Sequence, residues 1–363
     1  MNPTGSLHIA SPLRDSVPLT KVAGTAVYLK LDTAQPTGSF KIRGIGHLCK
    51  TWAERGCQQF VCSSEIIVKG QNEYHPARSA TLEWINYSCV TVILQVLTAG
   101  GNAGMAAAYS ARKLGVPATI LVPTSTPPFT IQRLKDEGAS VTVVGEMLDE
   151  TIEQAVKLAE NNPGCVYIPP FDNPLIWEGH MSLVAELKEA MERRPGAIVL
   201  SVGGGGLLCG VVRGLRHVGW ADVPIIAMET RGAHSLHAAV QAGELVTLPE
   251  ITSVAKTLGA KRVAAETLRL VSEHPVFSEV VTDREAVVAI ERFVDDEKIL
   301  VEPACGAALA AVYNNVIGKL QEEGKLCRDL GPVVVIVCGG NNITLGQLQR
   351  LKEQLGIPNL TAA

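Results

Sequence analysis

Four consecutive glycines are the residues of this chain best suited to binding a charged ligand. They follow a short apolar run, Ala197–Val202, and precede an apolar segment that starts at Leu207. This order predicts a strand, a loop at Gly203–Gly206 and a helix. Such a junction exposes backbone N–H groups at the positive end of a helix dipole, where a phosphate binds readily. A tight turn that only lets helix and strand pack closely is the alternative interpretation.

A nicotinamide dinucleotide is one phosphate ligand that such a loop could hold. A second predicted strand, Val223–Glu229, ends in an acid near the place where dinucleotide folds bind a ribose. Four adjacent glycines do not match the spaced G-x-G-x-x-G fingerprint, and the loop lies far from the first strand of the chain. The spacing therefore disfavours a dinucleotide.

A lysine near the N-terminus is a candidate nucleophile. A strand is predicted at Val27–Asp32, and Ser39 is placed to cap a helix whose first turn carries Lys41. Lysines are usually solvated, but the neighbours Phe40 and Ile42 give this one apolar surroundings. A desolvated amine is suited to forming a Schiff base with a carbonyl group.

These motifs resemble those of the fold-type II pyridoxal-phosphate enzymes. The resemblance rests on Ser39-Phe40-Lys41-Ile42-Arg43-Gly44, a split Ser-x-Gly-Asn motif and the tetraglycine loop, and it is greatest for serine/threonine dehydratases of the mammalian liver type. It implies an α/β fold of two lobes, similar to that of the tryptophan synthase β subunit, with parallel sheets covered by helices. Residues 1–45 and 150–363 would form the large cofactor-binding domain, and residues 46–149 the small domain.

The resemblance also implies a role for each motif toward pyridoxal 5′-phosphate. Lys41 would bind the cofactor through its amine and act as the catalytic base. Asn102 would hydrogen-bond the 3′-oxygen of the cofactor, and Cys338 would face the pyridine nitrogen. The cofactor-binding residues implied are Phe40, Lys41, Asn102, Gly203, Gly204, Gly205, Gly206, Leu207 and Cys338.

Two further sites follow from the same resemblance. Ser64 would contact the carboxylate of the substrate. Glu229 and Ala233 would bind a monovalent cation, such as K+, in place of the ribose contact considered above. The implied protein is a homodimer.

The activity implied is a pyridoxal-phosphate-dependent β-elimination. It would convert L-serine to pyruvate and ammonia, and L-threonine to 2-oxobutyrate, feeding amino-acid carbon to gluconeogenesis. A neutral thiol at Cys338 is a weak hydrogen-bond partner, which favours rapid elimination over a long-lived carbanion. A buried apolar role for this cysteine is the alternative. Serine racemases and β-replacing synthases share the Lys41 and glycine-loop signals, so they are rival activities.

One segment departs from the family pattern. Residues 65–100 stand between Ser64 and Gly101-Asn102, where the pattern has one residue. Ser64 and Asn102 must approach the same cofactor, and a displacement of about 1 Å in a positioning group can cost a hundredfold in rate. This interruption makes a catalytically silent isoform a further hypothesis.

Four other residues have weaker signals. Asp172, Trp177 and His180 are candidates to line the cofactor cleft, although a turn that leads into a helix explains most of their segment. Glu302 directly precedes Pro303 and is interpreted as an acid at the start of a helix.

The elements that must position these residues alternate between strands and helices. Strands are predicted at 118–122 and 140–144, and helices at 102–114, 131–137, 175–194 and 285–296. Alternation at short spacing indicates a parallel sheet covered on both faces.

The composition of the chain indicates the broad class of protein. With 363 residues, 47% of them hydrophobic, the chain can build two lobes around a cleft. A net charge of −4 gives no reason to expect nucleic acid or a membrane as a partner. Nine cysteines without a C-x-x-C pair, and an N-terminus without a signal pattern, favour the cytoplasm. The short sequence after Leu355 leads us to expect no regulatory domain.

Overall fold

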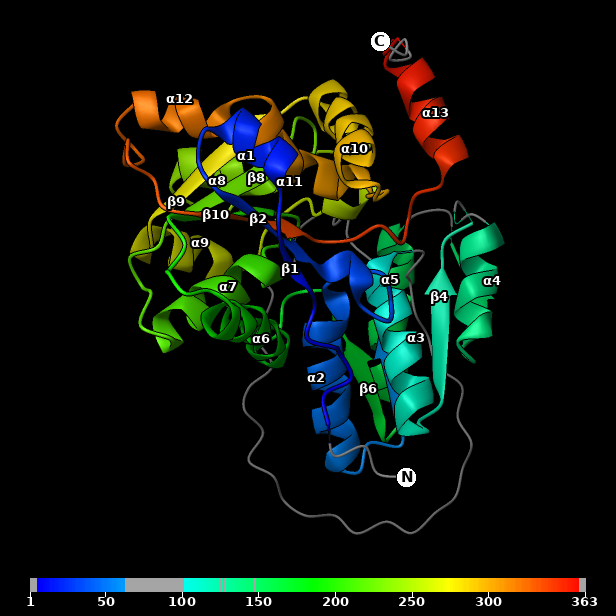
Figure 1. Ribbon diagram of the computed structural model, residues 1–363. Helices are drawn as coiled ribbons and strands as arrows, with labels where there is room; N and C mark the ends of the chain where they lie inside the picture. The colour runs from blue at the N-terminus through cyan, green and yellow to red at the C-terminus, as the bar shows by residue number, and fades with distance from the viewer. Residues whose placement is uncertain (1–4, 63–100, 125, 127, 146–147, 359–363) are drawn as a thin grey trace.

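The computed structural model describes residues 5–62, 101–124, 126, 128–145 and 148–358. Ser64 and the segment 65–100 lie outside the described residues. Two separate sheets form the centres of two lobes, with helices packed around each of them (Figure 1). The fold class predicted from the sequence, α/β with two lobes, is confirmed.

The larger sheet has six strands. Only the edge strand β1 runs antiparallel to its neighbour, and the other strands pair in parallel. Every residue of the three central strands β10, β7 and β8 is buried, as is typical of parallel strands covered on both faces. In spatial order the strands are β1 (Leu13–Asp15), β2 (Val27–Leu31), β10 (Val333–Val337), β7 (Ala197–Ser201), β8 (Ile225–Thr230) and β9 (Val276–Val281).

Helices pack on both faces of this sheet (Figure 1). On one face α11 crosses β7, β8 and β10 and is itself covered by α10, so all of its residues are buried. On the other face α6 and α7 pack against each other. The helices of this lobe are α1 (Val17–Ala23), α6 (Pro174–Ala190), α7 (Gly206–His217), α8 (Ser235–Ala242), α9 (Ala265–Glu273), α10 (Asp283–Glu297), α11 (Pro303–Tyr313), α12 (Val316–Glu322) and α13 (Leu345–Gln354).

The smaller sheet has four parallel strands. Its last strand begins at Cys165, so this sheet extends beyond residue 149, where the sequence predicts the small domain to end. The division of the chain into domains stays a prediction. The strands are β5 (Ser140–Val143), β4 (Ala118–Val122), β3 (Gln59–Cys62) and β6 (Cys165–Ile168), and the helices are α2 (Lys41–Glu54), α3 (Asn102–Leu114), α4 (Pro128–Asp136) and α5 (Leu148–Asn161).

Helix α2 joins the two lobes, because it packs against α3 on one side and α6 on the other. Its fully buried Arg43 donates two hydrogen bonds of 2.8 Å to Asp32, and it also pairs with Glu186 of α6. A buried guanidinium is tolerated only when such partners satisfy it. The network fixes the first turn of α2, which carries Lys41.

The predicted elements 102–114 and 118–122 coincide with α3 and β4. The prediction that Ser39 caps α2 is wrong. Phe40 occupies the N-cap position without a side-chain hydrogen bond, and the buried Oγ of Ser39 has no partner among the described residues. The physical reason is that Ser39 stands one residue before the N-cap, where its backbone forms a β-bridge with Gly339. Within the described residues, no helix is long and apolar enough to span a bilayer.

Candidate active site

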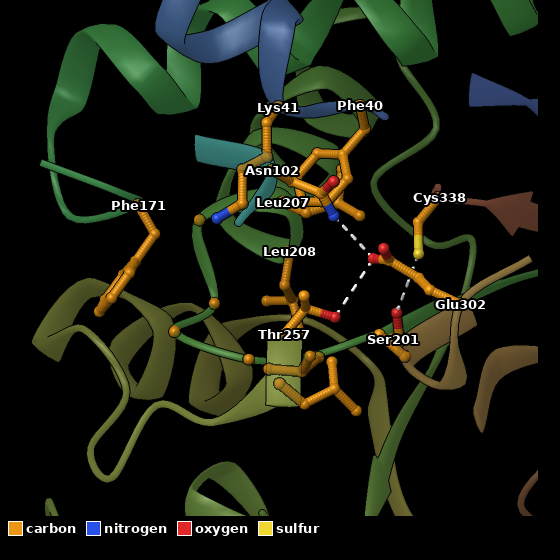
Figure 2. Close-up of a pocket in the computed structure, with 17 residues that line it drawn as sticks. Phe40, Lys41, Asn102, Phe171, Ser201, Leu207, Leu208, Thr257, Glu302 and Cys338 are labelled. Atoms are coloured by element: carbon orange, nitrogen blue, oxygen red, sulfur yellow. Dashed lines mark hydrogen bonds between the residues drawn. The ribbon is translucent and has the colours of Figure 1, made fainter. Parts of the chain in front are cut away.

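A pocket lies at the carboxyl ends of β7 and β10, where parallel sheets commonly bind ligands (Figure 2). It has an empty volume of about 480 Å³, part of it open to solvent. Its walls come from both lobes. They are formed by Phe40, Lys41, Asn102, Phe171, Ser201, Val202, Gly203, Gly204, Gly205, Gly206, Leu207, Leu208, Thr257, Leu258, Glu302, Ala304 and Cys338.

The structure therefore brings all nine predicted cofactor-binding residues to one pocket. Lys41 is the first residue of α2 and is only 6% exposed. Its amine donates a hydrogen bond of 2.9 Å to the carbonyl oxygen of Pro170 and lies 5.4 Å from the centre of the Phe40 ring. The amine is thus buried, oriented and next to an aromatic face.

The glycine loop and Lys41 line the same pocket (Figure 2). A Cβ atom at Gly204 would come within 2.4 Å of the Phe171 ring, and one at Gly205 within 2.0 Å of the Thr267 hydroxyl. Gly205 also has a φ of 90°, a conformation that favours glycine. The loop can follow this path only without side chains, so its backbone forms the wall of the pocket.

Four helices begin at the pocket, namely α2, α3, α7 and α11, and none of them has a side-chain cap. The first-turn N–H groups of a helix have no carbonyl partner in their own helix, and the dipole makes that end positive. An anion in the pocket would meet several such ends. Other helices of this chain do have side-chain caps, supplied by Ser16, Asn173, Thr282 and Thr344.

A buried polar cluster forms one wall of the pocket. The Nδ2 atom of Asn102 donates a hydrogen bond of 2.7 Å to Glu302, and its Oδ1 accepts one of 3.0 Å from Asn342. Thr257 donates to the same Glu302 oxygen at 3.2 Å. The prediction that Glu302 stands at the start of a helix is confirmed, since it occupies the N-cap position of α11. Its side chain makes no cap hydrogen bond and lines the pocket.

Cys338 directly follows β10 and is 2% exposed, with Ser201 Oγ 3.5 Å from its sulfur. A side-chain hydrogen bond with Cys305, together with burial, holds the pKa of Cys338 well above its usual range. The thiol is therefore neutral at physiological pH. The sequence analysis expects a neutral thiol at this position to favour elimination over a long-lived carbanion, and the raised pKa agrees with a neutral thiol.

The predicted cation residues Glu229 and Ala233 do not line this pocket. Glu229 ends β8, and its carboxylate accepts backbone hydrogen bonds from Leu236 at 2.9 Å and His237 at 2.7 Å, in the first turn of α8. Burial raises the pKa of Glu229 to about 8, although these two hydrogen bonds oppose the rise. Their role in cation binding stays a prediction.

The weaker candidates lie behind the pocket wall. Trp177 donates from Nε1 to the Phe171 carbonyl oxygen at 2.8 Å, and the His180 ring packs against Phe40 with 5.1 Å between ring centres. Burial and the nearby Lys41 hold the pKa of His180 well below its usual range, so its imidazole is neutral. Trp177, His180 and Asp172 do not line the pocket, but Phe171 of the same segment does. The prediction that this segment lines the cleft is therefore confirmed through Phe171 and is wrong for the three residues singled out. Trp177 and His180 contact the lining residues Phe171 and Phe40.

Sequence reasoning did not single out several lining residues, among them Phe171, Ser201 and Thr257. Ser201 ends the strand that leads into the glycine loop, so the motif itself indicates its position. Phe171 lies in the same candidate segment as Asp172, Trp177 and His180. Thr257 lies in a short 3-10 helix (Lys256–Leu258) without a motif, and only the tertiary fold brings it to the pocket.

The fold and the pocket together define an enzyme that holds a phosphorylated cofactor opposite a buried lysine. A family model described as "Pyridoxal-phosphate dependent enzyme" matches residues 90–339. This chain belongs to the family of pyridoxal-phosphate dependent enzymes.

Curated relatives and a solved structure agree with this assignment. The chain is 64% identical to the L-serine dehydratase/L-threonine deaminase of Rattus norvegicus, over 98% of each chain. It is also 64% identical to the protein of the same name from Homo sapiens, over 97% of each. The crystal structure of an L-serine ammonia-lyase from Rhizomucor miehei superposes with a TM-score of 0.81 at 35% identity, covering 96% of this chain and 99% of that one.

The pocket fits pyridoxal phosphate. The glycine loop lines the pocket and leads into the first turn of α7, whose backbone N–H groups suit a phosphate. The buried amine of Lys41 suits an aldehyde, and the neutral Cys338 thiol suits a ring nitrogen. All of these groups already line the same pocket.

Proposed function

We propose that this chain catalyses the β-elimination of water from L-serine and L-threonine. Serine yields pyruvate and ammonia, and threonine yields 2-oxobutyrate and ammonia. The water lost in the elimination is regained when the enamine product hydrolyses, so the net change is release of ammonia. The names of the relatives at 64% identity support this substrate class.

One observation carries the proposal: the Lys41 amine, the glycine loop and Asn102 line the same pocket. The backbone of Gly203–Leu207 would bind the phosphate, Asn102 the 3′-oxygen and Cys338 the ring nitrogen. When bound, the cofactor withdraws electrons from the substrate and so acidifies its Cα proton.

Lys41 removes that proton as the general base. Its hydrogen bond to the Pro170 carbonyl holds the amine at the pocket. The β-hydroxyl takes up a proton as it leaves, so the proton taken from Cα and the hydroxyl together amount to the loss of one water molecule. Cys338 keeps its own proton, because its pKa is raised, and it contributes no charge to the ring.

The test is to incubate the purified protein with pyridoxal phosphate and L-serine or L-threonine. Release of 2-oxoacid and ammonia in equal amounts supports the proposal. Formation of D-serine, or of a thioether when a thiol is added, would indicate a racemase or a β-replacing synthase. Bound cofactor without any product would indicate the silent isoform.

The wider setting belongs to the same proposal. The enzyme works in the cytoplasm, which the nine cysteines without a C-x-x-C pair support, and it supplies pyruvate carbon for gluconeogenesis. It acts as a homodimer, an inference that rests on the family resemblance. Glu229 and the Ala233 region bind a monovalent cation such as K+. Gel filtration, and unfolding measured with and without K+, test the last two points.

A further inference from the structure

Glu302 is a buried carboxylate at the cofactor pocket to which the proposed reaction assigns no role. It is 2% exposed and stands at the first turn of α11. An acid at this position usually serves the helix, but the Glu302 side chain makes no cap hydrogen bond there. Figure 2 shows the carboxylate pointing instead toward Asn102 and Thr257.

Three separate segments of the chain donate to this carboxylate. Oε1 accepts hydrogen bonds from Asn102 Nδ2 at 2.7 Å and from the Thr257 hydroxyl at 3.2 Å. Oε2 lies 3.4 Å from both the backbone N and the Nδ2 atom of Asn342. Asn102 begins α3, which packs on the smaller sheet, whereas the other partners belong to the larger lobe. Glu302 therefore joins the two lobes at the pocket.

The chemistry of these partners fixes which way the Asn102 amide faces. Asn102 presents Nδ2, the only donor atom of its side chain, to Glu302 Oε1. The Oδ1 atom then faces the donor Asn342 Nδ2 at 3.0 Å. A flipped amide would set oxygen against oxygen and NH2 against NH2. Nδ2 carries a second hydrogen, which the Glu302 contact does not use.

We propose that Glu302 is a positioning residue for the cofactor. It holds the Asn102 amide in the orientation that offers the second Nδ2 hydrogen to an oxygen atom of a ligand in the pocket. The inference rests on the proposed function, because that ligand is taken to be pyridoxal phosphate. Glu302 itself acts through Asn102 and accepts no proton from the substrate.

The test compares Glu302→Gln, Asn102→Ala and the double variant. Glutamine keeps the shape but can turn an NH2 group toward Asn102, which removes the preference for one amide orientation. A hydrogen bond to a charged group contributes about tenfold to a hundredfold to a binding affinity. Each single variant should therefore lower the affinity for pyridoxal phosphate at least about tenfold. The double variant should bind no more weakly than Asn102→Ala, because both changes remove the same contact. The absorption spectrum of the bound cofactor should shift in Glu302→Gln.

Glu285→Gln is the matched control. Glu285 completes the capping box of α10, which packs on α11, but it does not line the pocket. This variant should lower the unfolding temperature and leave the affinity for pyridoxal phosphate unchanged. A general loosening of α11 would instead weaken binding in the control as well.

Two results overturn the inference: unchanged cofactor affinity and spectrum in Glu302→Gln, or losses that multiply in the double variant. The affinity assay needs no turnover, so a protein that binds the cofactor but releases no oxoacid refutes the proposed function alone. If no cofactor binds, the same cycle is measured by thermal unfolding. The loss in the double variant should then be smaller than the sum of the single losses, and additive losses contradict the link between the two residues.

Discussion

The Lys41 amine and the Pro170 carbonyl oxygen are joined by a hydrogen bond of 2.9 Å. The residue after Pro170 is Phe171, whose ring packs over Gly204 and whose carbonyl oxygen accepts from Trp177. A single turn therefore holds the acceptor for the lysine and one wall of the glycine loop. The Lys41 amine and the glycine loop are thus positioned relative to each other by this turn.

Removing the support of this turn should slow the reaction. Trp177→Phe loses the 2.8 Å hydrogen bond to the Phe171 carbonyl but keeps a ring in place. We expect the rate of 2-oxoacid release to fall about tenfold, because a small displacement of the base slows proton transfer. The free energy of unfolding should fall by about 1 kcal/mol, because one hydrogen bond is lost. Trp220→Phe is the control, since Trp220 is equally buried and also stacked by a cation, Lys188, but does not donate to the Phe171 carbonyl oxygen. Equal losses of activity in both variants would contradict the role of the turn.

The glycine loop should not tolerate a methyl group. In Gly205→Ala the new Cβ would lie within 2.0 Å of the Thr267 hydroxyl, in addition to the strain of a φ of 90°. Gly219→Ala has a similar φ of 77° but an open space around its Cβ. We expect about 1 kcal/mol of destabilisation from the strain in both variants, and loss of cofactor binding only in the first. Equilibrium dialysis with pyridoxal phosphate and thermal unfolding measure the two effects. Normal affinity in Gly205→Ala would exclude the loop as the phosphate site.

In a buffer free of K+, Glu229 should make stability depend on pH, whereas a bound cation would lower the pKa of this carboxyl. Its folded pKa of about 8 lies above the unfolded value of 4.5, so the folded state keeps a proton that the unfolded state releases. Stability therefore falls as the pH rises from about 4.5 to about 8 and then levels off. Glu229→Gln should lose stability overall through one missing acceptor, yet its unfolding free energy should depend less on pH. If the two pH dependences are the same between pH 5 and 9, Glu229 is not a buried acid with a raised pKa.

Cys338 should control the outcome of the reaction through its neutrality. Cys338→Ser supplies another neutral partner, so we expect turnover within about tenfold of the parent and a pH profile of the same shape. Cys338→Asp supplies a carboxylate that keeps a pyridine protonated, which should slow elimination and allow D-serine to form. Chiral analysis of the serine recovered from each reaction measures this. Equally fast elimination in Cys338→Asp, with normal cofactor content, would show that the residue does not set the outcome.

The sequence predicted those helices and strands whose ends are marked by a few neighbouring residues. Helix α3 was predictable at both ends because Asn102 follows a glycine and Gly115 adopts the left-handed conformation that ends helices. The place of the tetraglycine loop and of Lys41 in the pocket was predictable because each motif spans only a few consecutive residues. Ser39 was misjudged, since its backbone pairs with Gly339 far along the chain.

The polar wall of the pocket was not predictable from the sequence. Glu302 stands before Pro303 and looks like an acid at a helix start, and only the fold shows its contact with Asn102, 200 residues away. Thr257 and Phe171 likewise reach the pocket through tertiary packing. Contacts between distant segments leave no trace in local periodicity, so this part of the site required the structure.

The interrupted loop allows a separate test. Strand β3 ends at Cys62 and α3 begins at Asn102, with residues 65–100 between them in the sequence. Replacing these residues by one alanine restores the uninterrupted pattern and should raise turnover strongly, by up to about a hundredfold if one group is displaced by 1 Å. Lys41→Ala in the shortened chain controls for contaminating activity. Equal turnover in the two forms would mean that the segment does not impair the site.

The central claim is that Lys41 carries pyridoxal phosphate in the pocket opposite the glycine loop. The most direct measurement is to reduce the protein with borohydride in the presence of the cofactor, digest it and locate the modified lysine by mass spectrometry. The account predicts a phosphopyridoxyl group on the peptide that contains Lys41, and its absence in Lys41→Ala. Modification of a different lysine, or of none, would contradict the account.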